Sequence, residues 1–183
     1  YGSSGIAINK IDSTTVRTLT SDGLGILLSN KNSYDQHGRL RYSRGSHLTN
    51  PAYNAHATNF KLDFADNVIE EAYEQTRMGM TLSTISETEI DHSGRPIGHW
   101  HTLVDNGNIG PRVKTTETAY TAKDQVALTK LGISSNGSLQ QVDFDYLPNG
   151  FLSKINDVSN LGTDVFGLTL GYDQPLSGSG VQG

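Results

Sequence analysis

Apolar and polar residues alternate along much of the chain, and this pattern predicts short β-strands. The alternation is clearest where Val142, Phe144 and Tyr146 interleave with Asp143 and Asp145, so that the apolar side chains share one face of an extended strand. Turn-forming clusters of Gly, Asn, Ser and Asp separate such segments. Further strands are predicted at 6–8, 16–19, 81–90, 96–103, 115–120, 126–133 and 165–172, with loops at 45–58 and 157–163.

Residues 66–77 give two incompatible predictions. Asp66 could cap a helix in which Val68, Ile69 and Ala72 share one face. The repeat described next instead makes this segment an extended strand. We take the strand as the prediction because it keeps the register of the rest of the chain.

A seven-residue unit recurs five times and organises the sequence. Its clearest copies are Tyr-Asp-Gln-His-Gly-Arg-Leu at 34–40 and Ile-Asp-His-Ser-Gly-Arg-Pro at 90–96, and Tyr-Leu-Pro-Asn-Gly-Phe-Leu at 146–152 keeps the outline. Degraded copies occupy 62–68 and 120–126. The first positions lie 28, 28, 30 and 26 residues apart, a spacing typical of repeat proteins. Each copy is predicted to be the turn of a β-hairpin.

The fifth position of the unit predicts the backbone of each turn. It is Gly38, Gly94 and Gly150 in three copies, and Asp66 and Asp124 in the other two. Glycine adopts a positive φ without steric cost, and Asp is one of the few other residues that tolerate the left-handed region. We therefore expect a positive φ and a β-bulge at the exit of every turn.

The other turn residues are interpreted as structural because they recur from turn to turn, with ligand binding as the alternative. Asp35 and Asp91 follow the first position of their copies, and Arg39 and Arg95 follow the glycine. We expect each arginine to lie along the neighbouring strand and to bind carbonyls or an acidic residue of an adjacent repeat. Aromatic first positions are interpreted as packing residues with a polar tip, at Tyr34, Tyr120 and Tyr146.

The heptads resemble the YD repeat of the Rhs family, whose usual form is Tyr-Asp-x-x-Gly-Arg-Leu. The stretch Phe-Asp-Tyr-Leu-Pro-Asn-Gly-Phe-Leu-Ser-Lys-Ile-Asn-Asp at 144–157, followed by Phe-Gly-Leu-Thr-Leu-Gly-Tyr at 166–172, is similar to the end of the repeat region in Rhs-type bacterial surface proteins. There, Tyr-Asn-x-Arg-Gly-Trp-Leu precedes Lys-Ile-Asn, and Leu147, Asn149 and Phe151 replace its Asn, Arg and Trp here. The resemblance covers roughly residues 24–176.

This resemblance implies an all-β fold in which antiparallel β-hairpin YD repeats form an arc of a large β-spiral sheet, the wall of a shell or cocoon. It divides the chain into lead strands at 1–23, a repeat sheet at 24–157, and a terminal strand with a Ser/Gly-rich loop at 158–183. In bacterial members the shell commonly encloses a C-terminal toxin, and insecticidal toxin complexes and teneurins also form cocoons. We expect the chain to be a fragment of the repeat region near its C-terminal end.

Composition narrows the classes of function. Hydrophobic residues make up only 34% of the chain, which is low for the dense interior of a compact enzyme. The net charge of -5 would repel a long phosphate backbone, so nucleic acid is not an expected partner. Cysteine is absent, which excludes disulfides and thiolate metal sites. No stretch approaches the roughly 20 apolar residues of a membrane-spanning helix, and the first residues do not resemble a signal peptide.

His99-Trp100-His101, with His92 in the preceding turn, is the strongest candidate for metal chemistry. Residues 99 and 101 fall on one face of a strand, where two imidazoles could share a metal such as zinc. The sequence shows no third ligand, and exposed histidines on a Thr-rich strand are the alternative. The remaining histidines belong to turn or loop sequence, at His37, His47 and His56.

No pattern predicts a catalytic centre. Gly178-Ser179-Gly180 lies in a Ser/Gly tail without a base, and Gly23-Leu24-Gly25 lacks the third glycine and the helix of a phosphate-binding loop. A glycosidase would need two carboxylates facing each other across a cleft. The candidate carboxylates alternate with apolar residues, and we interpret them as lying on the solvent-exposed face of strands: Glu70, Glu71, Glu87, Glu89, Asp143 and Asp145. We assign no catalytic, cofactor-binding or metal residue and no cofactor.

Two functions follow from these observations. The first is a non-catalytic structural segment of a shell that encloses or displays a C-terminal toxin or effector, secreted or on the bacterial cell surface. Its partners would be adjacent repeats and cargo of the same parent chain, with secretion machinery or surface-anchoring proteins. The second is an extracellular adhesive or carbohydrate-binding module that presents Trp100, Tyr42 and Tyr73 to a ligand. An enzyme ranks third, because the family's autoproteolysis depends on a later segment that has no match here.

Overall fold

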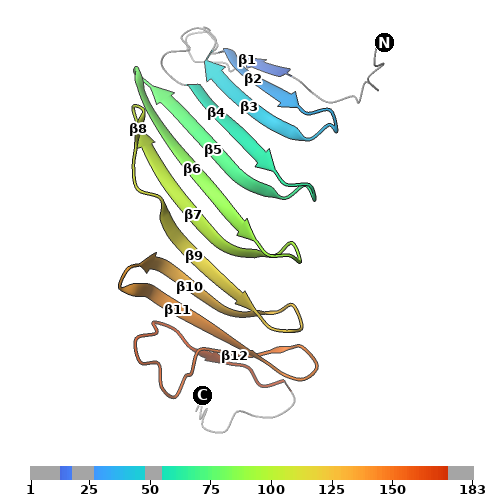
Figure 1. Ribbon diagram of the computed structural model, residues 1–183, viewed down its shortest axis with the longest axis vertical. Coiled ribbons are helices and arrows are strands. Elements are labelled where there is room, and N and C mark those ends of the chain that lie inside the picture. The colour runs from blue at the N-terminus through green and yellow to red at the C-terminus, as the bar shows by residue number, and fades with distance from the viewer. Residues whose placement is uncertain (1–12, 18–26, 48–54, 173–183) are drawn as a thin grey trace. The chain divides into compact units, whose positions relative to one another are not determined.

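The computed structural model describes residues 13–17, 27–47 and 55–172, and all regular structure in these ranges is β-strand. The strands follow one another as antiparallel hairpins (Figure 1). The all-β antiparallel fold is therefore confirmed. The described part of the chain contains no helix that is long and apolar enough to cross a membrane. Two compact units divide the chain, Tyr1–Val113 and Lys114–Gly183.

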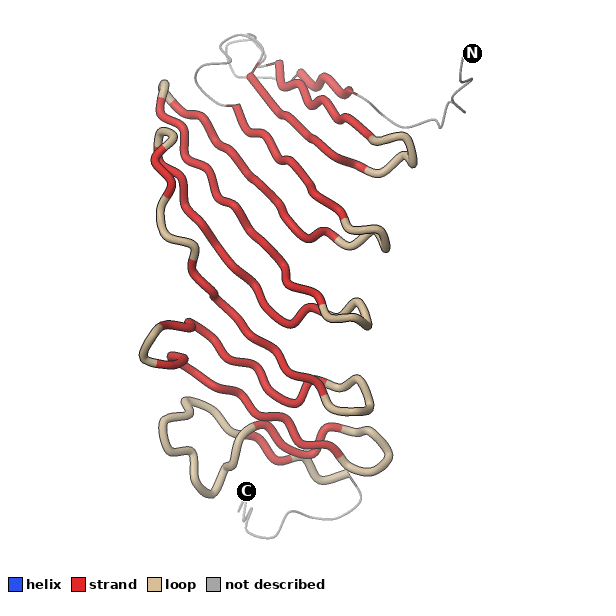
Figure 2. Tube along the Cα trace, in the orientation of Figure 1, coloured by secondary structure: helices blue, strands red, loops and turns tan. Residues whose placement is uncertain are grey.

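The first unit is an antiparallel meander in which each strand pairs with the next along the chain. Figure 2 shows that the turns between β2 and β3, β4 and β5, and β6 and β7 lie along the same side of this sheet. No described pairing joins β1 to β7 or β8, so the sheet of this unit stays open. Its strands are β1 (Ser13–Arg17), β2 (Leu27–Tyr34), β3 (Leu40–His47), β4 (Ala55–Leu62), β5 (Val68–Arg77), β6 (Met80–Ile90), β7 (Pro96–Asp105) and β8 (Asn108–Ile109).

The second unit is a shorter meander of the same kind, with consecutive strands paired in order. Its third strand, β11, alternates half-buried and exposed residues along its whole length, as the alternation of Val142, Phe144 and Tyr146 with aspartates predicts. The strands are β9 (Val113–Tyr120), which starts at the boundary, β10 (Val126–Ser134), β11 (Gly137–Tyr146), β12 (Leu152–Ile155) and β13 (Leu168–Thr169).

Residues 68–77 form strand β5, which confirms the strand prediction over the helix. The preceding Asp66 has a φ of 69°, so it turns the chain into the return strand instead of capping a helix. Pairing with β4 on one side and β6 on the other then satisfies the backbone of β5. Tertiary pairing overrides the local helical periodicity here.

Several predicted boundaries are wrong. The loop predicted at 45–58 is shorter, because β3 continues to His47 and β4 begins at Ala55. The strand predicted at 165–172 is reduced to Leu168–Thr169, which pair with Ile155 and Lys154 of β12. The structure adds two features that the sequence pattern does not predict. They are the short strand β8 and the tight turn at Met78 and Gly79, whose φ values are 52° and 78°. The predicted strand at 6–8 and the Gly23 and Ser179 segments lie outside the described residues.

The described residues of the two units do not form a conventional hydrophobic core. Among the described residues, no hydrophobic side chain is buried, and the buried polar residues are Thr102 and Asn156. Phe64 is 99% exposed at the tip of a turn. Stable domains normally pack two layers of secondary structure against each other. The described strands of each unit form a single layer, so the apolar side chains on their faces are half-buried or exposed.

Candidate functional site

The five repeated turns share one backbone geometry, as the sequence predicts. At the fifth position φ is 77° at Gly38, 69° at Asp66, 80° at Gly94, 62° at Asp124 and 91° at Gly150. The register of the flanking strands shifts beside every turn, which marks a β-bulge. In each turn the N–H of the second residue donates to the carbonyl of the sixth, and the N–H of the fifth donates back to the carbonyl of the second.

An aspartate at the second position holds the first and third turns closed. Asp35 Oδ1 accepts from the N–H groups of His37 and Arg39 at 2.9 and 3.0 Å, and Asp35 Oδ2 accepts from Arg39 Nε at 2.6 Å. Asp91 makes the same three contacts with Ser93 and Arg95. The Arg39 backbone N–H, together with its guanidinium, lowers the pKa of Asp35 to about 2. The Arg95 guanidinium and backbone N–H likewise lower the pKa of Asp91 to about 2.

The other three turns reach the same backbone with different side chains. Asp63 accepts from the N–H groups of Ala65 and Asn67, and the Asn67 amide takes the place of the arginine. Thr121 Oγ1 accepts from the N–H groups of residues 123 and 125 at the longer distance of 3.2 Å. Leu147 has no side-chain acceptor, and Asn149 Oδ1 accepts from the Phe151 N–H instead.

Side chains also connect successive turns within each unit. Arg39 Nη1 donates to Asp66 Oδ1 at 2.7 Å and to the Asp63 carbonyl at 3.4 Å, so it binds the next repeat as predicted. In the second unit, Gln125 Nε2 donates to the Gly150 carbonyl at 2.8 Å and Lys123 Nζ to the Pro148 carbonyl at 3.2 Å. The sixth position thus reaches the following turn in both units.

The aromatic first position behaves as predicted at Tyr146. Its side chain is half-buried, and its hydroxyl donates to the Val126 carbonyl of the preceding hairpin at 2.8 Å. Asn156, in the Lys-Ile-Asn segment, accepts from the Asp143 N–H at 2.8 Å and donates to the Phe166 carbonyl at 2.7 Å. This buried amide ties the 157–167 loop to β11, a role that the sequence did not reveal.

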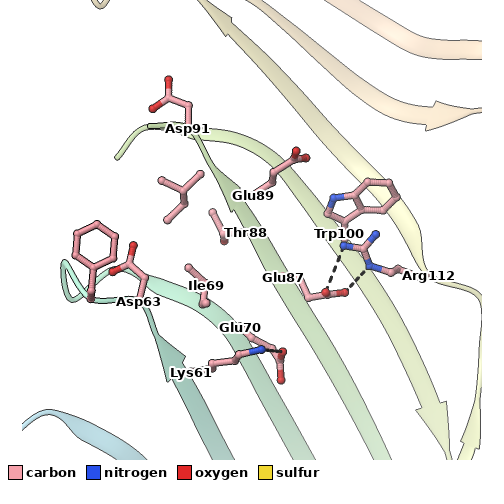
Figure 3. A pocket seen from close by; sticks show the side chains of 12 residues that line it. Lys61, Asp63, Ile69, Glu70, Glu87, Thr88, Glu89, Asp91, Trp100 and Arg112 are labelled. Atoms are coloured by element: carbon pink, nitrogen blue, oxygen red, sulfur yellow. Dashed lines mark hydrogen bonds and ion pairs between the residues drawn. The ribbon is translucent and has the colours of Figure 1, made fainter. Parts of the chain in front are cut away.

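A hollow of about 570 Å³ opens on the first unit (Figure 3). Its floor follows one row of cross-strand partners, Lys61, Glu70, Glu87 and Trp100, on β4 to β7. Arg112, in the link after β8, lies 3.8 Å from the centre of the Trp100 ring. Its Nε and Nη2 donate to the two Glu87 oxygens at 2.6 and 3.3 Å. Trp100 and Glu87 together form a clamp around a guanidinium.

The sequence does not group the members of this clamp. Its alternating pattern predicts Glu87 on the solvent-exposed face of a strand, and the adhesive hypothesis places Trp100 on a ligand surface, but neither includes Arg112. Only the register that sets Glu87 opposite Trp100 brings them together. No sequence motif marks Arg112, because its position depends on the path of the link after β8.

His99 and His101 lie on one face of β7, as predicted, but on the face opposite Trp100. Thr88 Oγ1 lies 3.2 Å from His99 Nδ1, and Ser86 Oγ lies 3.4 Å from His101 Nδ1. Within the described ranges, no group of three or more His, Cys, Asp or Glu residues is placed to hold a metal ion. The two imidazoles are thus neighbours of hydroxyls on β6.

The three aromatic residues proposed as one ligand surface do not share a face. Tyr42 pairs with Asn59, which pairs with Ala72, whereas Tyr73 is the next residue along β5. Successive residues of a strand point to opposite faces, so Tyr73 faces away from Tyr42 and Trp100. Tyr73 stacks instead on His56, with ring centres 6.4 Å apart. The combined aromatic surface predicted for an adhesive module is therefore wrong.

Neither a protein-family model nor a curated protein matches this chain. The likeness of the heptads to YD repeats accordingly stays a prediction from the sequence.

Proposed function

We propose that the chain is a non-catalytic structural segment of an Rhs/YD-repeat shell, an arc of a β-spiral that encloses or displays the C-terminal toxin or effector of a secreted or surface-bound bacterial protein. The observation that carries this proposal is the repeated turn. The same bulged hairpin recurs five times, and side chains at its sixth position bind the following turn within both units.

The incomplete burial of apolar side chains in the described strands supports the same proposal. No hydrophobic side chain is buried in the described ranges, so each hairpin depends on its neighbours for the partial burial it has. This is the energetic pattern of repeat proteins, whose stability is a sum of units and nearest-neighbour contacts.

Limited proteolysis of the full-length protein tests the proposal. A shell predicts that the C-terminal portion resists protease until denaturant unfolds the repeats, so that both are lost at the same denaturant concentration. The isolated C-terminal portion is the matched control, since it should be cleaved without denaturant. Digestion of the C-terminal portion while the repeats remain intact would contradict enclosure.

An adhesive module is the second candidate, and Trp100 beside a hollow is the observation that favours it. Arg112 covers one face of the Trp100 ring, however, which removes a surface on which a sugar would stack. An adhesive module predicts that the C-terminal portion is cleaved freely in the same proteolysis experiment.

A further inference from the structure

We propose that the hollow of the first unit binds an extended, arginine-rich segment of a partner protein, and that Arg112 occupies one guanidinium position of this site from within the chain. The proposal does not depend on the shell, because it rests on the chemistry of the hollow alone.

The contacts of Arg112 show which chemistry the hollow accepts. A guanidinium stacks on an aromatic face and binds a carboxylate with two parallel N–H groups. Trp100 and Glu87 provide both features, at 3.8 Å from the ring and at 2.6 and 3.3 Å to the carboxylate oxygens. An ammonium group would use only part of this geometry. The site therefore favours arginine over lysine.

The hollow extends from the Trp100 and Arg112 contact to Asp63 and Phe64 in the turn between β4 and β5. Apart from Asp63 and Asp91, which hold their own turns, its lining has three carboxylates and two cations: Glu70, Glu87 and Glu89 against Lys61 and Arg112. This excess of negative charge attracts a basic segment electrostatically. Phe64, 99% exposed, lies in the lining at the turn and offers a second aromatic surface. Figure 3 shows the carboxylates of Glu87 and Glu89 on the same side as Trp100.

Two glutamates of the floor are direct cross-strand partners, Glu70 and Glu87. Like charges in this position destabilise a sheet. Lys61 lies 3.5 Å from Glu70, and Arg112 binds Glu87, so each carboxylate is held by a cation at the surface. These two cations offset the repulsion, which shows that the floor accommodates positively charged groups beside its carboxylates.

The test measures binding of a fluorescein-labelled dodecapeptide of alternating Arg and Gly to the full-length protein by fluorescence anisotropy. In the Arg112→Ala background, where no internal guanidinium competes, Glu87→Gln should weaken binding about tenfold, since it removes a charge-assisted hydrogen bond. Trp100→Leu should weaken it about three- to fivefold, whereas Trp100→Phe should keep most of the affinity. Arg112→Ala should strengthen binding at least about threefold, because it removes a competitor with a high effective concentration.

Glu71→Gln is the matched control. Glu71 lies between Glu70 and Ala72 in β5, so its side chain points to the face of the sheet away from Glu70 and the hollow. It removes the same charge at a distance from the hollow and should leave binding unchanged. Circular dichroism shows whether each variant keeps its β-structure. If Trp100→Leu does not fold, the Trp100→Phe variant still tests whether an aromatic ring at this position is sufficient for binding. The proposal would be overturned if Glu71→Gln and Glu87→Gln weakened binding equally. It would also be overturned if Arg112→Ala left binding unchanged or weaker, or if the protein did not bind the peptide at about 1 mM.

Discussion

The third and fifth turns show that one backbone can be built with different side chains. Around Asp91, one carboxylate accepts two backbone N–H groups and a guanidinium. Around Leu147 the second position has no acceptor, yet both backbone hydrogen bonds and the positive φ at Gly150 are retained. The bulge and the fifth position therefore define the turn, and the second position adjusts its strength.

Low pH should have the largest effect on stability, because it protonates the second-position aspartates of three turns together. The pKa values of Asp35 and Asp91 are about 2, and the Asn67 amide and nearby backbone N–H groups lower the pKa of Asp63. An aspartate in the unfolded chain has a pKa of about 3.9. The stabilisation from these carboxylates is therefore complete above about pH 4 and is lost as the pH falls through about 2.

Carboxyl-carbon NMR titration of the full-length protein measures these pKa values directly, and denaturant unfolding at pH 5, 3 and 2 measures their effect. Asp91→Asn should flatten the pH dependence, since the amide no longer titrates. A titration midpoint near pH 4 for both Asp35 and Asp91 would show that their hydrogen bonds do not stabilise the turns.

Gly94→Ala tests the fifth position and should destabilise the protein by about 1–2 kcal/mol, the cost of a left-handed residue with a Cβ. The φ of Gly94 is 80°, and a Cβ there would contact nothing within 4 Å, so the cost is backbone strain alone. Gly94→Asn should cost less, because Asn tolerates this region. Denaturant midpoints measure both variants. Equal stability of Gly94→Ala and the parent would mean that the fifth position does not define the turn.

The sequence predicts the parts of the structure that depend on local chemistry. A positive φ at the fifth position, including Asp66 and Asp124, follows from the few residues that tolerate it. The contact from Arg39 to the next turn follows from the repeat spacing. Met78, with a φ of 52°, has no such signal, because the pairing of β5 with β6 imposes the turn.

The clamp could not be predicted for a related reason. Glu87 and Trp100 are separated by a turn in sequence, and only the shift in register next to the bulge sets them opposite each other. Arg112 then reaches them from an irregular link. Register and loop path depend on the whole sheet. Local sequence patterns therefore do not predict which of these residues become neighbours.

Thr121→Asp should have the smallest effect of these changes, and it should make the protein more stable. The Thr121 hydroxyl accepts the two backbone N–H groups at 3.2 Å, whereas the aspartates accept theirs at 2.8 to 3.0 Å. A carboxylate forms shorter, stronger hydrogen bonds, which predicts a gain of about 0.5–1 kcal/mol by denaturant unfolding. Thr121→Val keeps the shape but removes the acceptor, and should lose stability. If Thr121→Asp is no more stable than Thr121→Val, the second position contributes nothing, and the bulge alone accounts for all five turns.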